Sequence, residues 1–431
     1  MGAVTTALVL GAGFGGLGAA RALAGAPTDV VLVDRHDYHT FQPLLYQVAT
    51  AALDPETVGH PVRALVDDQG NLRFHQATVT GIDLGSRQVS FAETAALSYD
   101  HLVVALGAGV DYFGVRGAAE HAFPLYTLED AVRLKDHMLG RFEASEDAGA
   151  AGPGALDVVV VGGGPTGVET AGALAEWYRH ELERDYPHLP VGDAAITLVE
   201  RGGRLLEMFP NEIGAYAQRE LERRGVVVRL GTEVTAVTPS GATVGPGDQL
   251  SAQTLVWAAG LQASPLAQAL GVELDHGRAS VAEDLSLAAH PEVFVVGDIA
   301  LVASGRGAGP LPQLGSVALQ AGEHAGRSIA RRAHGEPTEA FHYRDKGTMA
   351  TIGRGAAVVE LPGGHHLTGR LAWLAWGAVH LALLTGGDSR ASTLVDWAWM
   401  FFTHDRPSRV TVGAAEEDEE LGDLRGRGST A

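Results

Sequence analysis

Two copies of one glycine pattern constrain the fold of this chain more than any other feature. Each copy is a run of four apolar residues, 7–10 or 158–161, that leads into the order G-x-G-x-x-G. The glycines are Gly11, Gly13 and Gly16 in the first copy, and Gly162, Gly164 and Gly167 in the second. In such a motif the first glycine permits a tight turn, the second lets a pyrophosphate approach the backbone, and the third lets a helix pack on a strand. Each copy therefore predicts a buried strand, a phosphate-binding turn and a helix.

Each copy is followed by a second apolar strand that ends in an acidic residue. The stretch DVVLVD ends in Asp34, and AITLVE ends in Glu200. An acid at this position accepts hydrogen bonds from ribose hydroxyls and repels the 2′-phosphate of NADP. A lone glycine motif is weak evidence in a chain with 57 glycines, but here strand, glycines, helix and acid agree twice. We therefore predict an α/β fold with two dinucleotide-binding Rossmann units, rather than two units whose glycines serve packing alone.

Composition limits the class of protein. With 431 residues, 46% of them hydrophobic and 19% charged, the chain is expected to form two or three globular domains. The formal charge of −21 argues against a nucleic-acid partner, which would select a basic face. The histidines lack the spacing of a metal site, so no metal is predicted. The N-terminus leads almost directly into a strand, which predicts a cytoplasmic chain without a signal peptide.

The lack of cysteine is the most informative fact of composition. A chain with no cysteine holds no disulfide, no thiolate-ligated cluster and no redox-active thiol pair. The sequence therefore excludes those flavoproteins with two nucleotide sites that pass electrons through a pair of cysteines.

The order of the segments predicts that the first Rossmann unit is completed late in the chain. The stretch EVFVVGDIA, which contains Asp298, follows elements that already complete the second unit, so the chain is expected to return to the first. This is a glutathione-reductase-type arrangement of two nucleotide-binding domains. The predicted divisions are 1–115 with 265–345, then 116–264, then a C-terminal region, 346–410, and an acidic disordered tail, 411–431.

The C-terminal region carries two short apolar segments that are rich in tryptophan. Residues 371–384 are nearly uncharged, but a helix that spans a bilayer needs roughly 20 apolar residues. Trp373, Trp376, His380 and Leu383 follow helical spacing along one face, and LVDWAWMFF adds further aromatic residues. Two interpretations stay open on this pattern: a peripheral membrane anchor, or a helix pair packed on its own body or on a second subunit.

Seven segments spread over the chain resemble those of type II NADH dehydrogenases, the NADH:quinone oxidoreductases that do not pump protons. They are FQPLLYQVATAALDPETVGHPVR, YDHLVVALGA, VVVVGGGPTGVETAGALAE, LVWAAGLQASPLA, VFVVGDIA, YRDKGTMATIGRGAAV and LVDWAWMFFTHDR. The resemblance extends to about residue 410, and DKGTMATIGR is its most specific part. It implies two Rossmann-like domains with a C-terminal helical, membrane-associating segment, and an enzyme that passes electrons from NADH through FAD to a membrane quinone.

The resemblance also implies which residues hold the two nucleotides, with FAD in the first glycine turn and NADH in the second. The residues implied for FAD are Gly11, Gly13, Phe14, Gly15, Gly16, Asp34, Arg35, Val79, Ala105, Gly107, Asp298, Val317 and Ala318. Those implied for NADH are Gly162, Gly164, Thr166, Gly167, Glu200, Ala259 and Gly260. The chain departs from the family at Leu106, where threonine is usual.

Two charged residues are implied as catalytic. Glu169 follows the second glycine turn and would bind the carboxamide of the nicotinamide, beyond the phosphates. Its alternative role is that of a carboxylate favoured by a helix N-terminus. Lys346, in the DKG context, would face the flavin and stabilise its reduced anionic form. Without the resemblance, a solvated surface lysine would be expected there.

The implied acceptor site departs from the family. The family's A-Q-x-A-x-Q-Q-G segment reads GSVALQAG here, with Ser316 in place of the first glutamine and Ala321 in place of the last. Ser316 and Gln320 are the residues implied for quinone binding. Loss of a glutamine removes a hydrogen bond worth roughly 0.5–1.5 kcal/mol and opens volume beside the ring. We therefore expect weaker quinone binding, or a bulkier or different acceptor.

The resemblance favours a membrane anchor, and it implies an enzyme attached peripherally to the cytoplasmic face of the cell membrane, with a homodimer as a further possibility. Residues 370–409 carry four arginines and three aspartates, so lipid binding is expected to be hydrophobic rather than electrostatic. Two other functions stay open. A related flavoprotein reductase would reduce a protein carrier or a small aromatic metabolite in place of quinones. A non-catalytic, NADH-responsive flavoprotein would be reduced by NADH only slowly with every acceptor.

Overall fold

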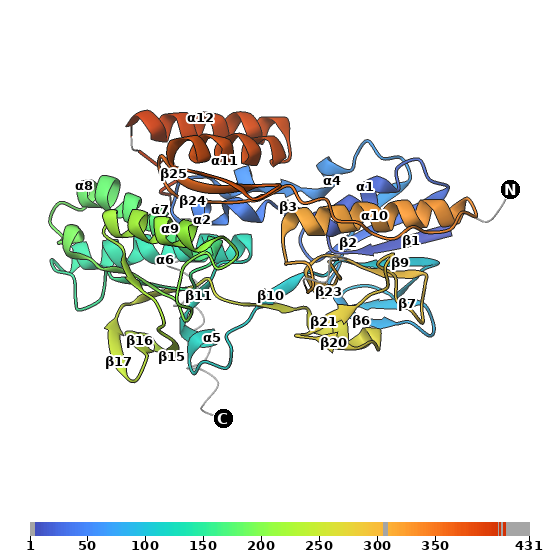
Figure 1. The fold of residues 1–431 in the computed structure, drawn as a ribbon, viewed down its shortest axis with the longest axis horizontal. Helices are drawn as coiled ribbons and strands as arrows, with labels where there is room; N and C mark the ends of the chain where they lie inside the picture. The colour runs from blue at the N-terminus through green and yellow to red at the C-terminus, as the bar shows by residue number, and fades with distance from the viewer. Residues whose placement is uncertain (1–4, 305–308, 404, 407, 411–431) are drawn as a thin grey trace, which may run out of the picture. The chain divides into compact units, whose positions relative to one another are not determined.

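The computed structural model describes residues 5–304, 309–403, 405, 406 and 408–410, which form two compact units (Figure 1). The first unit consists of the chain up to Thr40, of Gly59–Asp111 and of Leu261–Lys346. The second consists of Phe41–Val58, of Tyr112–Gly260 and of the chain from Gly347 onward. The predicted acidic tail, 411–431, lies outside the described residues.

A parallel sheet of five strands is the core of the first unit. Its strands are β1 (Thr5–Leu10), β2 (Thr28–Asp34), β5 (Leu72–Gln76), β9 (His101–Val104) and β22 (Val293–Val295). Their order is β22-β9-β1-β2-β5, and all neighbours are parallel. Most of these residues are apolar and buried, as in a sheet covered on both faces. Because β22 pairs with β9, a late segment completes the first sheet, as the segment order predicts.

Two helices of the first unit approach each other closely. The glycine turn joins β1 to α1 (Phe14–Ala22), which packs against α10 (Gly315–Ala333) (Figure 1). A Cβ on Gly322 would lie 1.9 Å from the carbonyl oxygen of Gly15, and one on Gly326 would lie 2.4 Å from that of Ala19. Only glycine permits this contact.

The remaining elements of the first unit are short. Its small sheets comprise β3 (Tyr38–Thr40), β4 (Gly59–Pro61), β6 (Val79–Asp83), β7 (Gln88–Phe91), β8 (Leu97–Ser98), β10 (Ala108–Val110), β19 (Leu261–Ala263), β20 (Leu274–Asp275), β21 (Arg278–Ser280) and β23 (Ala300–Leu301). Its short helices are α4 (Val62–Leu65) and the 3-10 helices η4 (Pro265–Leu270) and η5 (Gly297–Ile299).

The second unit repeats the parallel sheet. Its strands are β11 (Phe123–Pro124), β12 (Val158–Val161), β13 (Ile196–Val199), β14 (Val227–Arg229) and β18 (Thr254–Trp257). Their order is β11-β18-β12-β13-β14, again all parallel. The four valines of β12 occupy its centre and are buried. A small antiparallel sheet is formed by β15 (Val234–Thr238), β16 (Gly241–Val244) and β17 (Asp248–Ser251).

Helices of the second unit lie around this sheet. They are α2 (Leu45–Ala49), α3 (Pro55–Val58), α5 (Ala118–His121), α6 (Leu128–Asp147), α7 (Pro165–Trp177), α8 (Glu183–Asp185) and α9 (Asn211–Arg223), with the 3-10 helices η1 (Gln42–Leu44) and η3 (Val191–Asp193). A π-helical turn, η2 (Tyr178–Leu182), continues α7. Such turns are rare and often mark functional sites. A capping box of Thr127 and Asp130 begins α6.

The C-terminal region belongs to the second unit. It consists of an antiparallel sheet, β24 (Thr348–Gly353), β25 (Ala356–Leu361) and β26 (His365–Thr368), followed by α11 (Gly369–Leu383) and α12 (Gly387–Thr403). Figure 1 shows α11 and α12 side by side. A Cβ on Gly172 of α7 would lie 1.9 Å from the carbonyl oxygen of Ile352, so β24 packs directly on α7. Within the described ranges, no helix is long and apolar enough to cross a membrane.

The compact units differ from the predicted divisions in two respects. The prediction placed residues 41–58 in the first domain, but α2 packs against α6 and α7 in the second unit. The prediction also treated 346–410 as a region of its own, whereas β24 and α11 pack within the second unit. Which nucleotide each unit binds stays a prediction.

Candidate functional site

In the first glycine turn, the fold requires two glycines and leaves a third facing open space. Gly11 has a φ of +100°, and a Cβ there would lie 2.3 Å from the carbonyl oxygen of Ala105. A Cβ on Gly16 would lie 1.6 Å from the carbonyl oxygen of Gly11. At Gly13, no described atom lies within 4 Å of such a Cβ. The open side of Gly13 is therefore where a ligand can approach the backbone.

The second glycine turn has the same division. Gly162 has a φ of +111°, and a Cβ there would lie 2.7 Å from the carbonyl oxygen of Ala258. A Cβ on Gly167 would lie 1.9 Å from the carbonyl oxygen of Gly162, whereas the Cβ position of Gly164 meets no described atom within 4 Å. Both turns therefore fit a phosphate-bearing nucleotide at the N-terminus of the following helix.

The acid after each turn holds the residue between the first two glycines. Asp34 Oδ2 accepts the backbone N–H of Ala12 at 2.6 Å. Glu200 Oε2 accepts that of Gly163 at 2.5 Å. Each carboxylate is thereby fixed at the end of its strand, beside the turn that it was predicted to serve.

The carbonyl group of the same residue is also held in both turns. His39 Nδ1 lies 2.8 Å from the carbonyl oxygen of Ala12, and the backbone N–H of Leu206 donates to that of Gly163 at 2.8 Å. Burial lowers the pKa of His39 to about 4, so the ring is neutral and Nδ1 carries the hydrogen. Because a peptide's C=O and N–H point in opposite directions, the next N–H, that of Gly13 or Gly164, points away from the held carbonyl.

Residues implied for FAD come together at the carboxyl edge of the first sheet. A Cβ on Gly15 would lie 3.4 Å from the carbonyl oxygen of Ala318, 3.7 Å from the Cβ of Ala105 and 3.3 Å from the side chain of Val296. The structure thus joins three predicted residues from α1, from the end of β9 and from α10.

Other implied residues lie nearby in sequence or at the same edge. Gly107 follows β9 with a φ of +63°, and half-buried Asp298 follows β22. The ring of Phe14 meets His39 edge-on at 5.1 Å. Half-buried Val79 begins β6, whereas Arg35 is exposed.

The start of α10 determines which backbone N–H groups near Val317 and Ala318 are open to a ligand. The helix begins at Gly315, so the N–H of Ala318 already donates to the carbonyl oxygen of Leu314 at 2.9 Å. Among the described residues, the N–H groups of Gly315, Ser316 and Val317 have no backbone acceptor. A contact through Val317 stays available to a ligand, whereas one through the N–H of Ala318 does not.

Ser316 and Gln320, the residues implied for quinone binding, both make hydrogen bonds within the first unit. Ser316 Oγ lies 3.0 Å from the hydroxyl of Tyr343. The side chain of Gln320 both donates to the carbonyl oxygen of Arg344 and accepts its N–H, each at 3.0 Å. Both polar ends of the Gln320 amide are thus taken by backbone. Lys346 is exposed.

The remaining residues implied for NADH surround the second turn. Half-buried Thr166 lies in the first turn of α7, and its carbonyl oxygen accepts the hydroxyl of Thr170 at 2.6 Å. The Cα of Ala259 lies 3.1 Å from the Cβ position of Gly162, and Gly260 follows with a φ of +75°.

Glu169 lies on α7 in the second turn of the helix and faces the C-terminal sheet. Its Oε1 accepts the backbone N–H of Thr351 at 3.1 Å. Burial raises the pKa of Glu169 to about 8, against the opposing effect of the Thr351 hydrogen bond. The indole N–H of Trp376 also opposes this rise in the pKa of Glu169. It is buried and has no hydrogen-bond acceptor among the described residues. A carboxyl that is protonated at neutral pH gains little from a helix dipole, so the alternative role predicted for Glu169 is not favoured.

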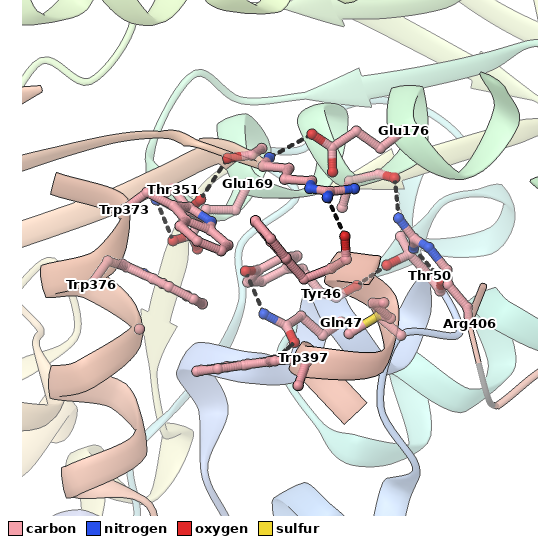
Figure 2. A pocket seen from close by; sticks show the side chains of 18 of the residues that line it. Tyr46, Gln47, Thr50, Glu169, Glu176, Thr351, Trp373, Trp376, Trp397 and Arg406 are labelled. Atoms are coloured by element: carbon pink, nitrogen blue, oxygen red, sulfur yellow. Dashed lines mark hydrogen bonds between the residues drawn. The ribbon is translucent and has the colours of Figure 1, made fainter. Parts of the chain in front are cut away.

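Glu169 lines a pocket of about 620 Å³ within the second unit (Figure 2). The wall is formed mainly by α2, α7, β24, α11 and α12, and most of its surface is apolar and aromatic. The polar side chains that line it are Tyr46, Gln47, Thr50, Glu169, Glu176, His180, Glu181, Thr351, Arg354 and Arg406. A cavity whose surface is mostly apolar but which also presents polar side chains is typical of sites for small hydrophobic ligands.

In a membrane anchor, the tryptophans of the C-terminal helices are expected to point outward. Not all of them do so here. Trp376 is only 3% exposed, and its ring stacks on His380 with centroids 4.4 Å apart. Trp373, Trp376 and Trp397 line the pocket. The exposed apolar surface of the two helices is formed instead by Leu371, Leu374, Val379, Leu383, Leu394, Val395, Trp399, Phe401 and Phe402. Leu374, Leu394, Phe401 and Phe402 belong to both sets, so the exposed surface continues into the pocket lining.

Several pocket residues were not predicted from the sequence. Tyr46 and Gln47 lie in FQPLLYQVATAA, and Arg406 lies near the end of the described chain. Buried Arg406 pairs with Glu181 of η2 at 3.2 Å and donates to the carbonyl oxygens of Thr50 and Ala173. The sequence signals for these residues are the polarity of Tyr46 and Gln47 within an otherwise apolar stretch, and the place of all three in segments that carry the family resemblance.

Comparisons with known proteins agree with this geometry. The pyridine nucleotide-disulphide oxidoreductase family matches residues 5–322. The chain is 37% identical over 422 residues to the type II NADH:quinone oxidoreductase Ndh of Mycobacterium tuberculosis, covering 94% of this chain and 89% of that protein. It is 31% identical over 374 residues to the type II NADH:quinone oxidoreductase of Staphylococcus haemolyticus, covering 85% and 91%. The structure of NDH2 from Plasmodium falciparum in complex with NADH matches with a TM-score of 0.84 at 20% identity, covering 94% and 99%.

Fold and paired glycine turns define an oxidoreductase class with two Rossmann-like units, here without a cysteine for disulfide chemistry. Within that class, the chain belongs to the type II NADH:quinone oxidoreductases. The predicted family, the α/β fold class and the prediction of an enzyme are confirmed.

Proposed function

We propose that this NADH:quinone oxidoreductase holds FAD in the first glycine turn, NADH in the second, and quinone in the pocket lined by α11 and α12. Transfer of electrons from NADH to a quinone is the activity of its family, and NAD(H) and a flavin are its cofactors. That the flavin is FAD is supported by Asp34, because a carboxylate at this strand end suits the ribose of an adenine nucleotide.

The observation that carries the acceptor assignment is the lining of the pocket. Aromatic and aliphatic side chains of α11 and α12 suit the ring and the tail of a quinone, while Tyr46 and Glu169 offer polar hydrogens to its oxygens. This pocket lies within one compact unit, and its helices also carry the exposed apolar surface. A lipid-soluble acceptor fits this combination better than a protein carrier, which is too large to enter a cavity of this size.

Glu169 is suited to supply a proton to the acceptor. Reduction of a quinone to a quinol consumes two electrons and two protons, whereas the hydride of NADH brings two electrons and one proton. A flavin held by the first glycine turn would supply the redox chemistry between the hydride of NADH and the quinone. With a pKa of about 8, Glu169 keeps its proton at neutral pH and can donate it to a carbonyl oxygen in the pocket. Its predicted contact with the nicotinamide stays a separate prediction.

The exposed side of α11 and α12 supports attachment to membrane lipid. Leu371 is 71% exposed and Phe402 is 79% exposed, with other large apolar side chains between them on the two helices. Exposed apolar helices of this kind bury their apolar face at a membrane interface. We propose that the enzyme attaches peripherally through this surface, at the cytoplasmic face as expected from the sequence.

The assignment is tested by identifying the flavin and comparing electron acceptors. Denaturation should release FAD, and NADH should reduce the bound flavin and then menadione or ubiquinone-1. NADPH should be a much poorer donor, because Glu200 would repel its 2′-phosphate. Release of FMN, equal kcat/KM for NADH and NADPH, or reduction of a ferredoxin but of no quinone would contradict the corresponding part.

A further inference from the structure

Three pocket residues form a hydrogen-bond chain that joins α12 to α2. The indole Nε1 of Trp397 donates to Gln47 Oε1 at 2.8 Å, and Gln47 Nε2 donates to the hydroxyl oxygen of Tyr46 at 2.8 Å (Figure 2). Gln47 and Tyr46 are each 6% exposed. The chain therefore lies in the wall of the cavity and not at its solvent-exposed rim.

The chemistry of tryptophan fixes the direction of this chain. An indole N–H can only donate, so the amide of Gln47 must turn its oxygen toward Trp397. Its NH₂ group then faces Tyr46, whose oxygen accepts the hydrogen bond. A phenol that accepts from one neighbour still has its own hydrogen to donate. Among the described residues, no hydrogen bond from the Tyr46 hydroxyl to a protein acceptor is formed.

We propose that the Tyr46 hydroxyl donates a hydrogen bond to a carbonyl oxygen of the quinone, and that Trp397 orients it through Gln47. The inference rests on the proposed function and adds the residue that recognises the quinone oxygen. A chain that ends in a donor selects an acceptor with a carbonyl group and disfavours ligands that present only donors.

The surroundings keep the phenol in its donating form. Burial, together with the nearby Glu169, raises the pKa of Tyr46 well above its usual range. Glu169 and Tyr46 line the same cavity from α7 and α2. Tyr46 positions the quinone through a hydrogen bond that lasts through the reaction, whereas Glu169 supplies the proton.

The test compares Tyr46→Phe with Tyr178→Phe, using menadione as the quinone and NADH as the donor. Tyr178 is a matched control, because it is a buried tyrosine of the same unit whose hydroxyl donates to the carbonyl oxygen of Leu156 at 2.8 Å, outside the pocket lining. Tyr46→Phe should raise the KM for menadione about 3- to 10-fold. Tyr178→Phe should leave it unchanged. Ferricyanide, which needs no hydrogen bond from the pocket, should be reduced equally by all three proteins.

A vibrational readout separates recognition from a merely structural role. A hydrogen bond lowers the stretching frequency of a quinone carbonyl, so menadione bound to the wild type should show one shifted carbonyl band. The shift should disappear in Tyr46→Phe. In Trp397→Phe the Gln47 amide can turn over, so the band should broaden and the KM should rise by less.

Each outcome bears on one part of the proposal. An unchanged KM and an unchanged carbonyl band in Tyr46→Phe would overturn the role of Tyr46 while leaving the proposed function standing. A wild-type enzyme that reduces ferricyanide but not menadione or ubiquinone-1 would overturn the proposed function itself. If Tyr46→Phe does not fold, Trp397→Phe decides, because an unbroadened band there would contradict the orienting chain.

Discussion

The two glycine turns of this chain hold the carbonyl groups of equivalent residues, Ala12 and Gly163, by different means. In the first turn the donor is the side chain of His39, and in the second it is the backbone of Leu206, which adopts a φ of +51° that is uncommon for a non-glycine residue. Either way, the residue between two glycines is held at both its N–H and its C=O. A turn fixed in this way presents the next N–H to a phosphate without ordering the loop on binding.

His39 is therefore predicted to position the first turn for FAD. His39→Leu removes the donor and should raise the dissociation constant for FAD about 3- to 10-fold. His39→Asn places an amide N–H near Nδ1 and should restore most of the affinity. The measurement is titration of the flavin-free protein with FAD, followed by flavin fluorescence. Equal affinities for the leucine and asparagine variants would show that only the volume of the side chain matters.

Glu169 predicts a pH dependence of quinone reduction. The rate of reoxidation of the reduced enzyme by quinone should fall as pH rises through about 8, where the carboxyl loses its proton. Glu169→Gln should slow this step on the order of 100-fold and remove the pH dependence. Reduction of the flavin by NADH serves as the control, and a slowed reduction would instead support the nicotinamide contact. A variant with the wild-type profile would exclude Glu169 as the proton donor.

The raised pKa of Glu169 also makes the stability of the fold depend on pH. Because burial raises the pKa of Glu169 above its ordinary value of 4.5, the protonated carboxyl stabilises the fold fully at low pH, and this contribution is lost as pH rises from about 4.5 through about 8. The stability of Glu169→Gln relative to the wild type should therefore be greater at a pH of about 9 than at a pH of about 6. Urea unfolding at the two pH values measures the difference.

At the scale of elements, Arg406, Ser408 and Val410 tie the C-terminal region to the rest of the second unit. The Arg406–Glu181 pair joins this segment to η2, and Ser408 bonds to Asp54 beside α3. Lys135 of α6, which is buried, donates to the carbonyl oxygen of Val410 at 3.0 Å. These contacts cross more than 200 positions in sequence, from 406 back to 181, from 408 to 54 and from 410 to 135.

Breaking the buried pair should destabilise the second unit. Arg406→Met leaves Glu181 buried without its partner and should cost about 3–5 kcal/mol of unfolding free energy, whereas Arg406→Met with Glu181→Leu should recover most of the loss. The pair of Glu220 and the exposed Arg223 on α9, in the same unit, is the control, and Arg223→Met should cost less than about 1 kcal/mol. All six tryptophans lie in the second unit, so their fluorescence during urea unfolding reports on it alone. A double variant as unstable as the single one would contradict this assignment.

The elements that could be predicted are those with a local signal. Buried parallel strands read as apolar runs, the glycines mark their turns, and Asp34 and Glu200 mark the strand ends, so both Rossmann units follow from the sequence. The start of α10 has no such signal, because no clear capping residue precedes GSV. The hydrogen bond from Trp397 to Gln47 joins residues 350 positions apart, and no periodic pattern links them. The pocket is therefore a tertiary feature that a local reading does not reveal.

At the scale of the whole molecule, charge and apolar surface act in opposite directions on membrane binding. The formal charge of −21 repels anionic lipid, while the exposed leucines and aromatic residues of α11 and α12 favour insertion. Attachment is therefore expected to depend on buried apolar area and not on charge.

Binding to vesicles should accordingly resist salt. Sedimentation with vesicles that contain anionic lipid should be as strong or stronger at about 1 M salt, where the screening length falls to about 3 Å. Leu374→Glu with Phe402→Glu should release the enzyme, whereas Leu361→Glu, at an exposed leucine of β25, should not. Release of the wild type by salt would indicate electrostatic attachment, and a full-length protein that never sediments would favour a homodimer through these helices.

Reduction of quinone in the pocket lined by α11 and α12 is tested most directly by filling that pocket. Ala378 lines the cavity, whereas Ala382, one turn further along α11, is exposed outside the lining. In anaerobic stopped flow, Ala378→Trp should be reduced by NADH at the wild-type rate but reoxidised by menadione at least about 10-fold more slowly, equivalent to about 1.4 kcal/mol in the barrier. Ala382→Trp should match the wild type in both steps. Reoxidation of Ala378→Trp at the wild-type rate would contradict the assignment of this pocket to the quinone.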